Sequence, residues 1–125
     1  MSLHALTPML RTPDLDGTAA FYTGTLGFAQ RAGSVDEGWI ALQRDGVELM
    51  LSGFNAHEND TAPAFTGSLY LRTDDVDGWW RTLKDAARVC YPIEDFAYGM
   101  REFAVYDNNG YLLQFGQPIA SFDAP

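Results

Sequence analysis

Few side chains in this sequence could perform chemistry, and they are spread along the chain. The two histidines are His4, near the start, and His57, in a polar stretch, while Cys90 is the single cysteine. A cysteine nucleophile needs a base beside it. Neither histidine is near Cys90 in sequence, so we expect Cys90 to be a small buried hydrophobe. For Glu48, the sequence offers no partner that would tune it as a general base. The sequence therefore predicts no catalytic residue.

A short motif that occurs twice defines the structural unit. Residues 10–17 (LRTPDLDG) return as residues 71–78 (LRTDDVDG), a shift from position 10 to position 71, or 61 residues, with six of eight positions identical. Two long copies are too few for a solenoid. We therefore expect a single domain over residues 1–125, built from repeat 1 at about 6–54 and repeat 2 at about 66–118.

The composition excludes several classes of protein. A chain of 125 residues with 46% hydrophobic and 14% aromatic residues can bury one core and is not disordered. Its net charge of −9 argues against nucleic acid and anionic membrane as partners. No apolar run is long enough to span a membrane, and no signal peptide is indicated. Because the single cysteine cannot form an internal disulfide, we expect a cytoplasmic protein.

Each repeat is predicted to form a strand, a helix and three further strands. The helices should cover about Asp14–Leu26 and Asp75–Ala87, because Asp is a strong N-cap and Gly27 can end the first helix. Two tight hairpins are expected. Asp45-Gly46 separates strands at 39–44 and 47–52, and the turn at 107–110 separates strands at 102–106 and 111–115.

Strand alternation separates a core face from a mixed face. We expect one set to pack under the helices: Leu10, Ile40, Leu42, Leu49, Leu51, Leu69, Leu71, Phe103, Val105, Leu113 and Phe115. The alternate positions carry Trp, Tyr, Met and Glu together, which favours a partly apolar ligand surface over a plain solvated face. Of the neighbouring Trp79 and Trp80, one should pack on the sheet. We expect Arg101 and Glu102 to form a salt bridge across neighbouring strands.

Two segments resemble the glyoxalase/bleomycin resistance/dioxygenase superfamily, also called the vicinal oxygen chelate (VOC) fold. The first covers residues 14–28 (DLDGTAAFYTGTLGF) and the second covers residues 98–110 (YGMREFAVYDNNG). The resemblance extends over about residues 6–117. It implies an α+β fold in which two βαβββ modules form a curved mixed sheet around a cleft, with the helices on the outside. Because this fold hosts binding proteins and several kinds of enzyme, it does not specify the function.

The resemblance also indicates where a metal would bind. Metal enzymes of the family carry His or Glu at four equivalent strand positions, which correspond here to Thr7, Met50, Ser68 and Gln114. Neutral hydroxyls, a thioether and an amide are a poor set of ligands for a hard divalent ion. We therefore expect no metal and no other cofactor.

Without a metal, the sequence most resembles the bleomycin resistance branch, whose members bind an antibiotic without chemistry. The resemblance implies a cleft for a small cationic or aromatic ligand, with stacking on Trp39 or Tyr70 and polar contacts from carboxylates. The expected cleft residues are Trp39, Glu48, Met50, Ser68, Tyr70, Glu102, Tyr106 and Gln114.

The resemblance further implies a homodimer in which an N-terminal arm, hinged at Pro8, crosses to the other subunit. Two alternative functions remain open. One is a glyoxalase- or dioxygenase-type enzyme with an atypical metal site. The other is a binding module for an unrelated metabolite.

Overall fold

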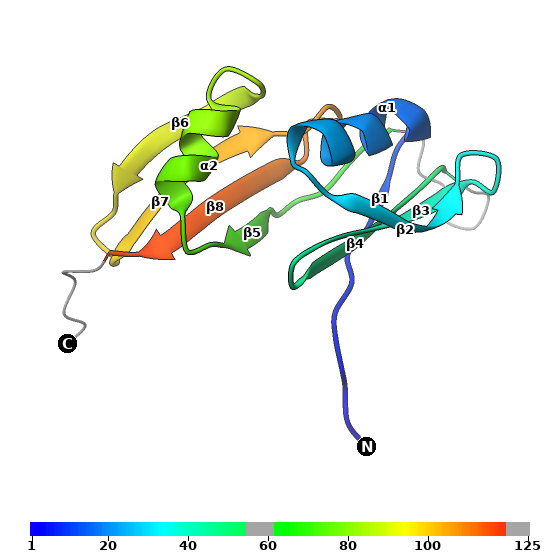
Figure 1. Ribbon diagram of the computed structural model, residues 1–125, viewed down its shortest axis with the longest axis horizontal. Helices are drawn as coiled ribbons and strands as arrows, with labels where there is room; N and C mark the ends of the chain where they lie inside the picture. Colours follow the sequence, from blue (N-terminus) through cyan, green and yellow to red (C-terminus); the bar gives the residue numbers. More distant parts are fainter. Residues whose placement is uncertain (55–61, 120–125) are drawn as a thin grey trace. The chain divides into compact units, whose positions relative to one another are not determined.

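A computed structural model of the chain describes residues 1–54 and 62–119 and divides it into two compact units, residues 1–63 and 64–125. His57 lies outside the described residues. Each unit contains a strand, a helix and three strands in that order (Figure 1). The first unit comprises β1 (Met9–Arg11), α1 (Leu15–Ala20), a π-helical turn η1 (Phe21–Thr25), β2 (Ala29–Ser34), β3 (Trp39–Arg44) and β4 (Val47–Ser52). The second unit comprises β5 (Leu69–Arg72), α2 (Val76–Leu83), β6 (Arg88–Asp95), β7 (Met100–Tyr106) and β8 (Leu112–Pro118).

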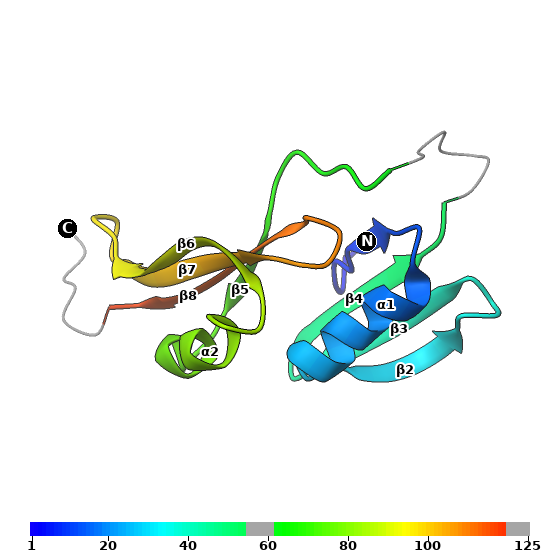
Figure 2. The same cartoon turned by 90° about the horizontal axis from the view of Figure 1, so that it is seen from above.

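The two sheets have the same topology. Their strand orders are β1-β4-β3-β2 and β5-β8-β7-β6. The first strand of each unit runs parallel to the last, and the other pairs are antiparallel. Each helix covers one face of the sheet in its own unit (Figure 2). The predicted α+β class with two βαβββ modules is confirmed.

Both helices begin where the aspartates predict. The side chain of Asp14 accepts a hydrogen bond from the amide of Gly17 at 3.0 Å, and Asp75 does the same for Gly78. The first helix continues through η1, and Gly27 follows with a φ of +74°. The predicted second helix was too long. It ends at Leu83, because the amides of residues 86 and 87 both fold back onto the Leu83 carbonyl before β6 begins.

The core lies under the helices, as the alternation predicts. Leu69 and Leu71 are exceptions because β5 is an edge strand, and they are only half-buried. The other predicted core residues are buried, namely Leu10, Ile40, Leu42, Leu49, Leu51, Phe103, Val105, Leu113 and Phe115.

Both tryptophans of α2 pack on the core face of the second sheet, whereas we expected only one to do so. The ring centroid of Trp79 lies 5.0 Å from that of Phe115, and Trp80 lies 5.2 Å from Phe103. The rings of Phe103 and Phe115 stack with their centroids 5.1 Å apart. Two adjacent helix residues can both reach the sheet because the two phenylalanines stand on neighbouring strands and receive one indole each.

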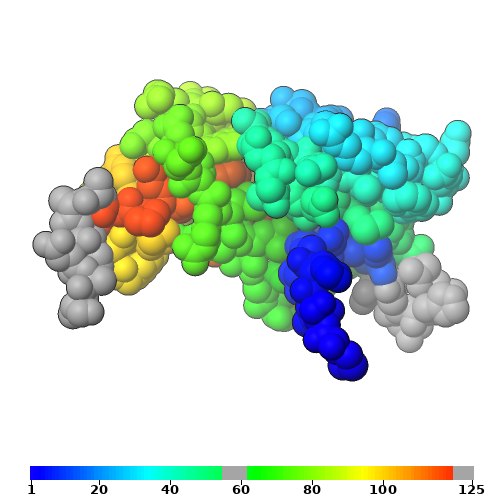
Figure 3. All heavy atoms as spheres, turned by 60° about the horizontal axis from the view of Figure 1, so that its bottom comes forward, coloured from blue at the N-terminus to red at the C-terminus, as the bar shows by residue number. Residues whose placement is uncertain are grey.

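The segment before β1 has no helix or strand. Met1, Leu3 and Leu6 are exposed, and Figure 3 shows this segment in dark blue extending away from its own unit. The carbonyl of Pro8 already accepts a hydrogen bond from the amide of Met50 at 2.9 Å. No helix within the described residues is long and apolar enough to cross a membrane.

Candidate ligand-binding surface

The second sheet carries a connected polar network on the face opposite α2. Its centre is Glu102 on β7, whose Oε1 accepts a hydrogen bond from the Tyr70 hydroxyl at 3.0 Å. Its Oε2 accepts one from the Tyr91 hydroxyl at 2.5 Å. The Gln114 amide donates to the Tyr91 oxygen at 2.9 Å, and the Ser68 hydroxyl donates to the Gln114 carbonyl at 2.5 Å. We call these five residues, four on separate strands and Ser68 immediately before β5, the Glu102 network.

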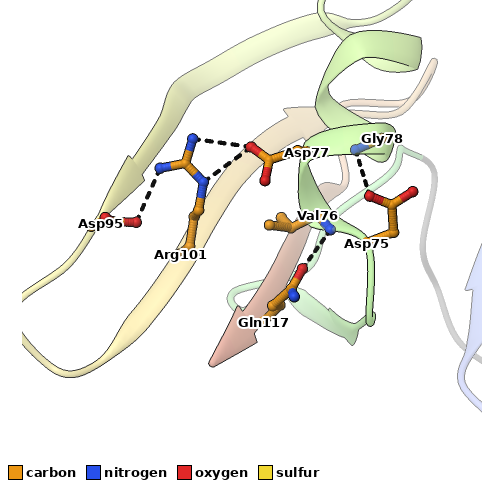
Figure 4. A network of polar contacts seen from close by, with 7 residues as sticks. All are labelled: Asp75, Val76, Asp77, Gly78, Asp95, Arg101 and Gln117. Atoms are coloured by element: carbon orange, nitrogen blue, oxygen red, sulfur yellow. Dashed lines mark hydrogen bonds and ion pairs between the residues drawn. The ribbon is translucent and has the colours of Figure 1, made fainter. Parts of the chain in front are cut away.

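Glu102 is only 1% exposed, so its carboxylate is enclosed by the protein. Burying a carboxylate is costly unless donors satisfy it, and two phenols do so here. The expected salt bridge between Arg101 and Glu102 is wrong, because adjacent residues of one strand point to opposite faces. Arg101 instead pairs with Asp77 of α2 and Asp95 of β6, each at 3.0 Å (Figure 4).

The environment of Glu102 keeps the neighbouring phenols protonated. Loss of hydration, followed by the hydrogen bond to Glu102, raises the pKa of Tyr70 from 10.0 to about 12. The same two causes raise the pKa of Tyr91 to about 12. The pKa of Tyr98 is also raised, by loss of hydration and by a hydrogen bond to Glu102. Tyr70 and Tyr91 therefore serve as hydrogen-bond donors to Glu102 and not as bases.

Three aromatic residues were missed from the sequence, one in the network and two beside it. Tyr91 packs edge-on against Phe96, with ring centroids 5.7 Å apart, and Phe96 stacks on Tyr98 at 5.4 Å. Tyr98 is 60% exposed. Strand alternation could not predict to which face these side chains point, because the pairing of β6 with β7 shifts register on both sides of Tyr91. For Phe96 and Tyr98, the signal that was available is their position immediately before the segment Gly99–Phe103.

Gly116 allows Tyr70 to reach Glu102. A Cβ atom at Gly116 would lie 2.0 Å from the Tyr70 hydroxyl oxygen, so any larger residue would displace the phenol. Gly116 is paired with Glu102 across β7 and β8, which places it directly beneath the hydrogen bond. The close approach therefore requires glycine at this position.

The middle of the equivalent face of the first sheet is apolar. In the second unit, Gln114 pairs with Tyr70 on one side and with Ala104 on the other. In the first unit, Met50 takes the place of Gln114 and pairs with Met9 and Ala41. Trp39 pairs with Ser52, as Glu102 pairs with Gly116, so Trp39 occupies the position of the buried carboxylate. Trp39 is half-buried, Met9 is 46% exposed, and Glu48 is exposed on the same face.

Tyr106 lies on the same strand as Glu102 but contacts other residues. Its hydroxyl donates to the Cys90 sulfur at 3.2 Å, and the Arg88 guanidinium lies 4.2 Å from its ring centre. The prediction of a buried Cys90 is wrong, since this thiol is exposed on the edge strand β6.

The four positions that the resemblance equates with metal ligands hold neutral side chains. Ser68 and Gln114 are hydrogen-bonded to each other. Met50 lies between Met9 and Ala41, and Thr7 is exposed before β1. Within residues 1–54 and 62–119, no three His, Cys, Asp or Glu side chains are grouped so that they could hold a metal ion.

Comparisons with known proteins place these features in a family. The model of the Glyoxalase/Bleomycin resistance protein/Dioxygenase superfamily matches residues 3–115. A bleomycin resistance determinant encoded on the transposon Tn5 is 30% identical, with 93% of this chain and 98% of that chain covered and a TM-score of 0.72. A bleomycin-binding protein complexed with bleomycin is 28% identical, with coverages of 94% and 100% and a TM-score of 0.71.

A lactoylglutathione lyase from Agrobacterium tumefaciens has the same fold. It is 16% identical, with coverages of 94% and 96% and a TM-score of 0.68. None of the curated proteins compared with the chain matches it.

Proposed function

The chain belongs to the Glyoxalase/Bleomycin resistance protein/Dioxygenase superfamily, and on that premise we propose that it binds a small molecule without chemistry. The observation that carries the proposal is the pairing of Ser68 with Gln114. Two positions that hold metal ligands in the family's metal enzymes are here neutral and hydrogen-bonded to each other. Because the pKa values of Tyr70 and Tyr91 are raised, neither phenol is available as a general base near neutral pH.

The proposed ligand carries a flat or cationic group. One of the similar proteins is complexed with bleomycin, which is therefore the first compound to test. The first unit supports binding of the flat group, because Trp39, Met9 and Met50 together give its sheet face an apolar surface with an exposed thioether chain. Indole rings bind varied ring systems at a low cost in side-chain entropy. The exposed carboxylate of Glu48 on the same face favours a positive charge.

Replacing Trp39 with alanine should weaken the binding of a flat cationic ligand by about 1–3 kcal/mol, because a buried aromatic anchor is lost. The affinity is measured by titrating the protein with bleomycin and following intrinsic fluorescence and calorimetric heat. Phe65→Ala removes an exposed ring elsewhere, at 52% exposure, and should leave the affinity unchanged. If bleomycin and a panel of planar cations leave the fluorescence, the heat and the melting temperature unchanged, the proposal is wrong. It would also be overturned by stoichiometric zinc, nickel, iron or manganese that survives dialysis.

We also propose that the protein is a cytoplasmic homodimer. Its single cysteine suits a reducing compartment. The exposed segment before β1 carries Leu3 and Leu6, two large apolar side chains that a partner subunit would cover. The edge strands of both sheets offer further backbone groups for pairing.

Sedimentation should therefore show a dimer at micromolar concentration. Deleting residues 1–6 should weaken the dimer if the arm crosses between subunits. A full-length monomer would contradict the dimer, and a deletion variant that dimerises as tightly as the full chain would contradict the role of the arm.

A further inference from the structure

We propose that the Glu102 network, together with Tyr98, forms a binding site for a cation that donates N–H hydrogen bonds, namely a primary ammonium or a guanidinium group. This inference rests on the proposed function and specifies the group of the ligand that the second unit recognises. All the residues that carry it belong to residues 64–125, which form one compact unit.

The hydrogen bonds of the network all run toward the carboxylate. The Ser68 hydroxyl donates to Gln114, and the Gln114 amide donates to the Tyr91 oxygen. Tyr91 in turn donates its proton to Glu102, and Tyr70 donates to the other carboxylate oxygen. A hydroxyl has one proton and two lone pairs. Because Glu102 takes the phenol protons, the phenol oxygens can only accept a hydrogen bond from a ligand.

The parts of this network that a ligand can reach are the phenols and not the carboxylate. Glu102 is 1% exposed, whereas Tyr70 is 37% exposed and Tyr98 is 60% exposed. Tyr98 stacks on Phe96, which packs against Tyr91 of the network. The negative charge of Glu102 therefore acts on a ligand through the exposed phenol of Tyr70. An acceptor surface above a buried negative charge selects a donor that carries a positive charge.

The aromatic faces around the network support the same ligand. The stack of Phe96 and Tyr98 offers a negative ring face to a cation. A guanidinium of the chain itself already uses such a face, since the Cζ of Arg72 lies 5.7 Å from the centre of the Tyr70 ring. Arg72 also allows the sign of the ligand's charge to be tested. Removing this exposed cation should tighten the binding of a cationic ligand and weaken the binding of an anionic one.

The experiment compares four probes on the full chain by NMR, with dissociation constants taken from amide shifts of β5 and β7. The probes are 2-phenylethylammonium, its trimethylated quaternary analogue, neutral 2-phenylethanol and anionic phenylacetate. The primary ammonium should bind most tightly. The quaternary ion keeps the charge but has no N–H donor, so it should bind about tenfold more weakly if the phenol oxygens accept hydrogen bonds.

Three variants test the named groups. Tyr70→Phe keeps the ring and loses the oxygen, and it should weaken binding of the primary ammonium about tenfold while leaving the quaternary ion unaffected. Glu102→Gln should weaken binding of both cations. The matched control is Asp85→Asn, which removes the same charge from an exposed residue in the turn after α2, away from the network face, and should change neither. Arg72→Met should tighten binding of the primary ammonium by roughly two- to fivefold.

Equal binding of the primary and quaternary ions would overturn the inference, as would tighter binding of phenylacetate. Weaker binding of the ammonium in Arg72→Met would also overturn it. If Glu102→Gln fails to fold, Tyr70→Phe and Arg72→Met still decide, because both positions are exposed. If bleomycin binds and changes the tryptophan fluorescence while no amine shifts β5 or β7, the inference fails and the proposed function stands. If neither binds, both fail.

Discussion

Replacing Phe103 with alanine should lower the free energy of unfolding by about 3–5 kcal/mol. Phe103 is 0% exposed, stacks on Phe115 and also contacts the tilted ring of Trp80, so its loss removes contacts with both. The stacked rings cannot close the gap, because Trp79 already lies against Phe115. A loss of this size is a large part of the 5–15 kcal/mol that stabilises an ordinary domain.

Urea unfolding followed by tryptophan fluorescence and by circular dichroism measures this effect. Phe65→Ala is the matched control, because Phe65 is 52% exposed and makes only an edge contact with Tyr111 at 6.5 Å. We expect it to change the stability by about 0.5 kcal/mol or less. A loss below 1 kcal/mol for Phe103→Ala would show that the aromatic cluster does not anchor α2 to its sheet.

The parts of the fold that were predicted correctly depend on local chemistry. The strands expected at 39–44 and 47–52 are β3 and β4 with the same bounds. The two-residue turn between them fixes the register, and Asp45 takes the positive φ of 50° that such a turn requires. The N-caps Asp14 and Asp75 are equally local. Because these features depend on a few adjacent residues, the sequence specifies them directly.

The parts that were missed depend on tertiary structure. The sequence contains Tyr91 and Glu102 but not the two register shifts in the pairing of β6 with β7, which bring the phenol onto the face of the carboxylate. Alternation places a side chain only while the pairing is regular. The same irregular strand leaves Cys90 exposed. The end of α2 at Leu83 was also missed, because a turn beyond the helix sets it.

Several residues of the candidate surface were therefore predicted, but the hydrogen bonds that connect them were not. Ser68, Tyr70, Glu102 and Gln114 were all expected on one face, and the structure joins them. What the sequence could not reveal is that Glu102 is enclosed. A glutamate in a strand looks the same in sequence whether it faces water or phenols. Only the three-dimensional positions of Tyr70 and Tyr91 show that Glu102 accepts hydrogen bonds from two phenols and does not contact a ligand directly.

Tyr91→Phe should lower the free energy of unfolding by about 1.5–3 kcal/mol at neutral pH, because a hydrogen bond to a buried charge is lost. The ring and its contact with Phe96 are kept, so no cavity forms. The Tyr91 hydroxyl also accepts from Gln114, whose amide loses a partner in the variant. Urea unfolding at pH 7 measures the loss, and a change below 0.5 kcal/mol would contradict a structural role for the network.

The same variant should change how stability depends on alkaline pH. The pKa of Tyr91 is about 12 in the folded protein and about 10 in an unfolded chain. The folded state therefore holds a proton that the unfolded state has lost between these values. The stability that arises from this shift is complete below pH 10 and is lost as pH rises toward 12. The advantage of the native protein over Tyr91→Phe should accordingly shrink between pH 10 and pH 12.

Absorbance titration of tyrosinate near 295 nm tests the cause of this shift. The native protein should show a group of tyrosines that ionise near pH 12, and Tyr91→Phe should lose one of them. Glu102→Gln removes the charge and the strong acceptor but leaves the ring desolvated. Because desolvation is the largest cause, the pKa of Tyr91 in that variant should fall only part of the way back to 10. A titration of Glu102→Gln identical to that of the native protein would mean that the carboxylate does not hold the phenol proton.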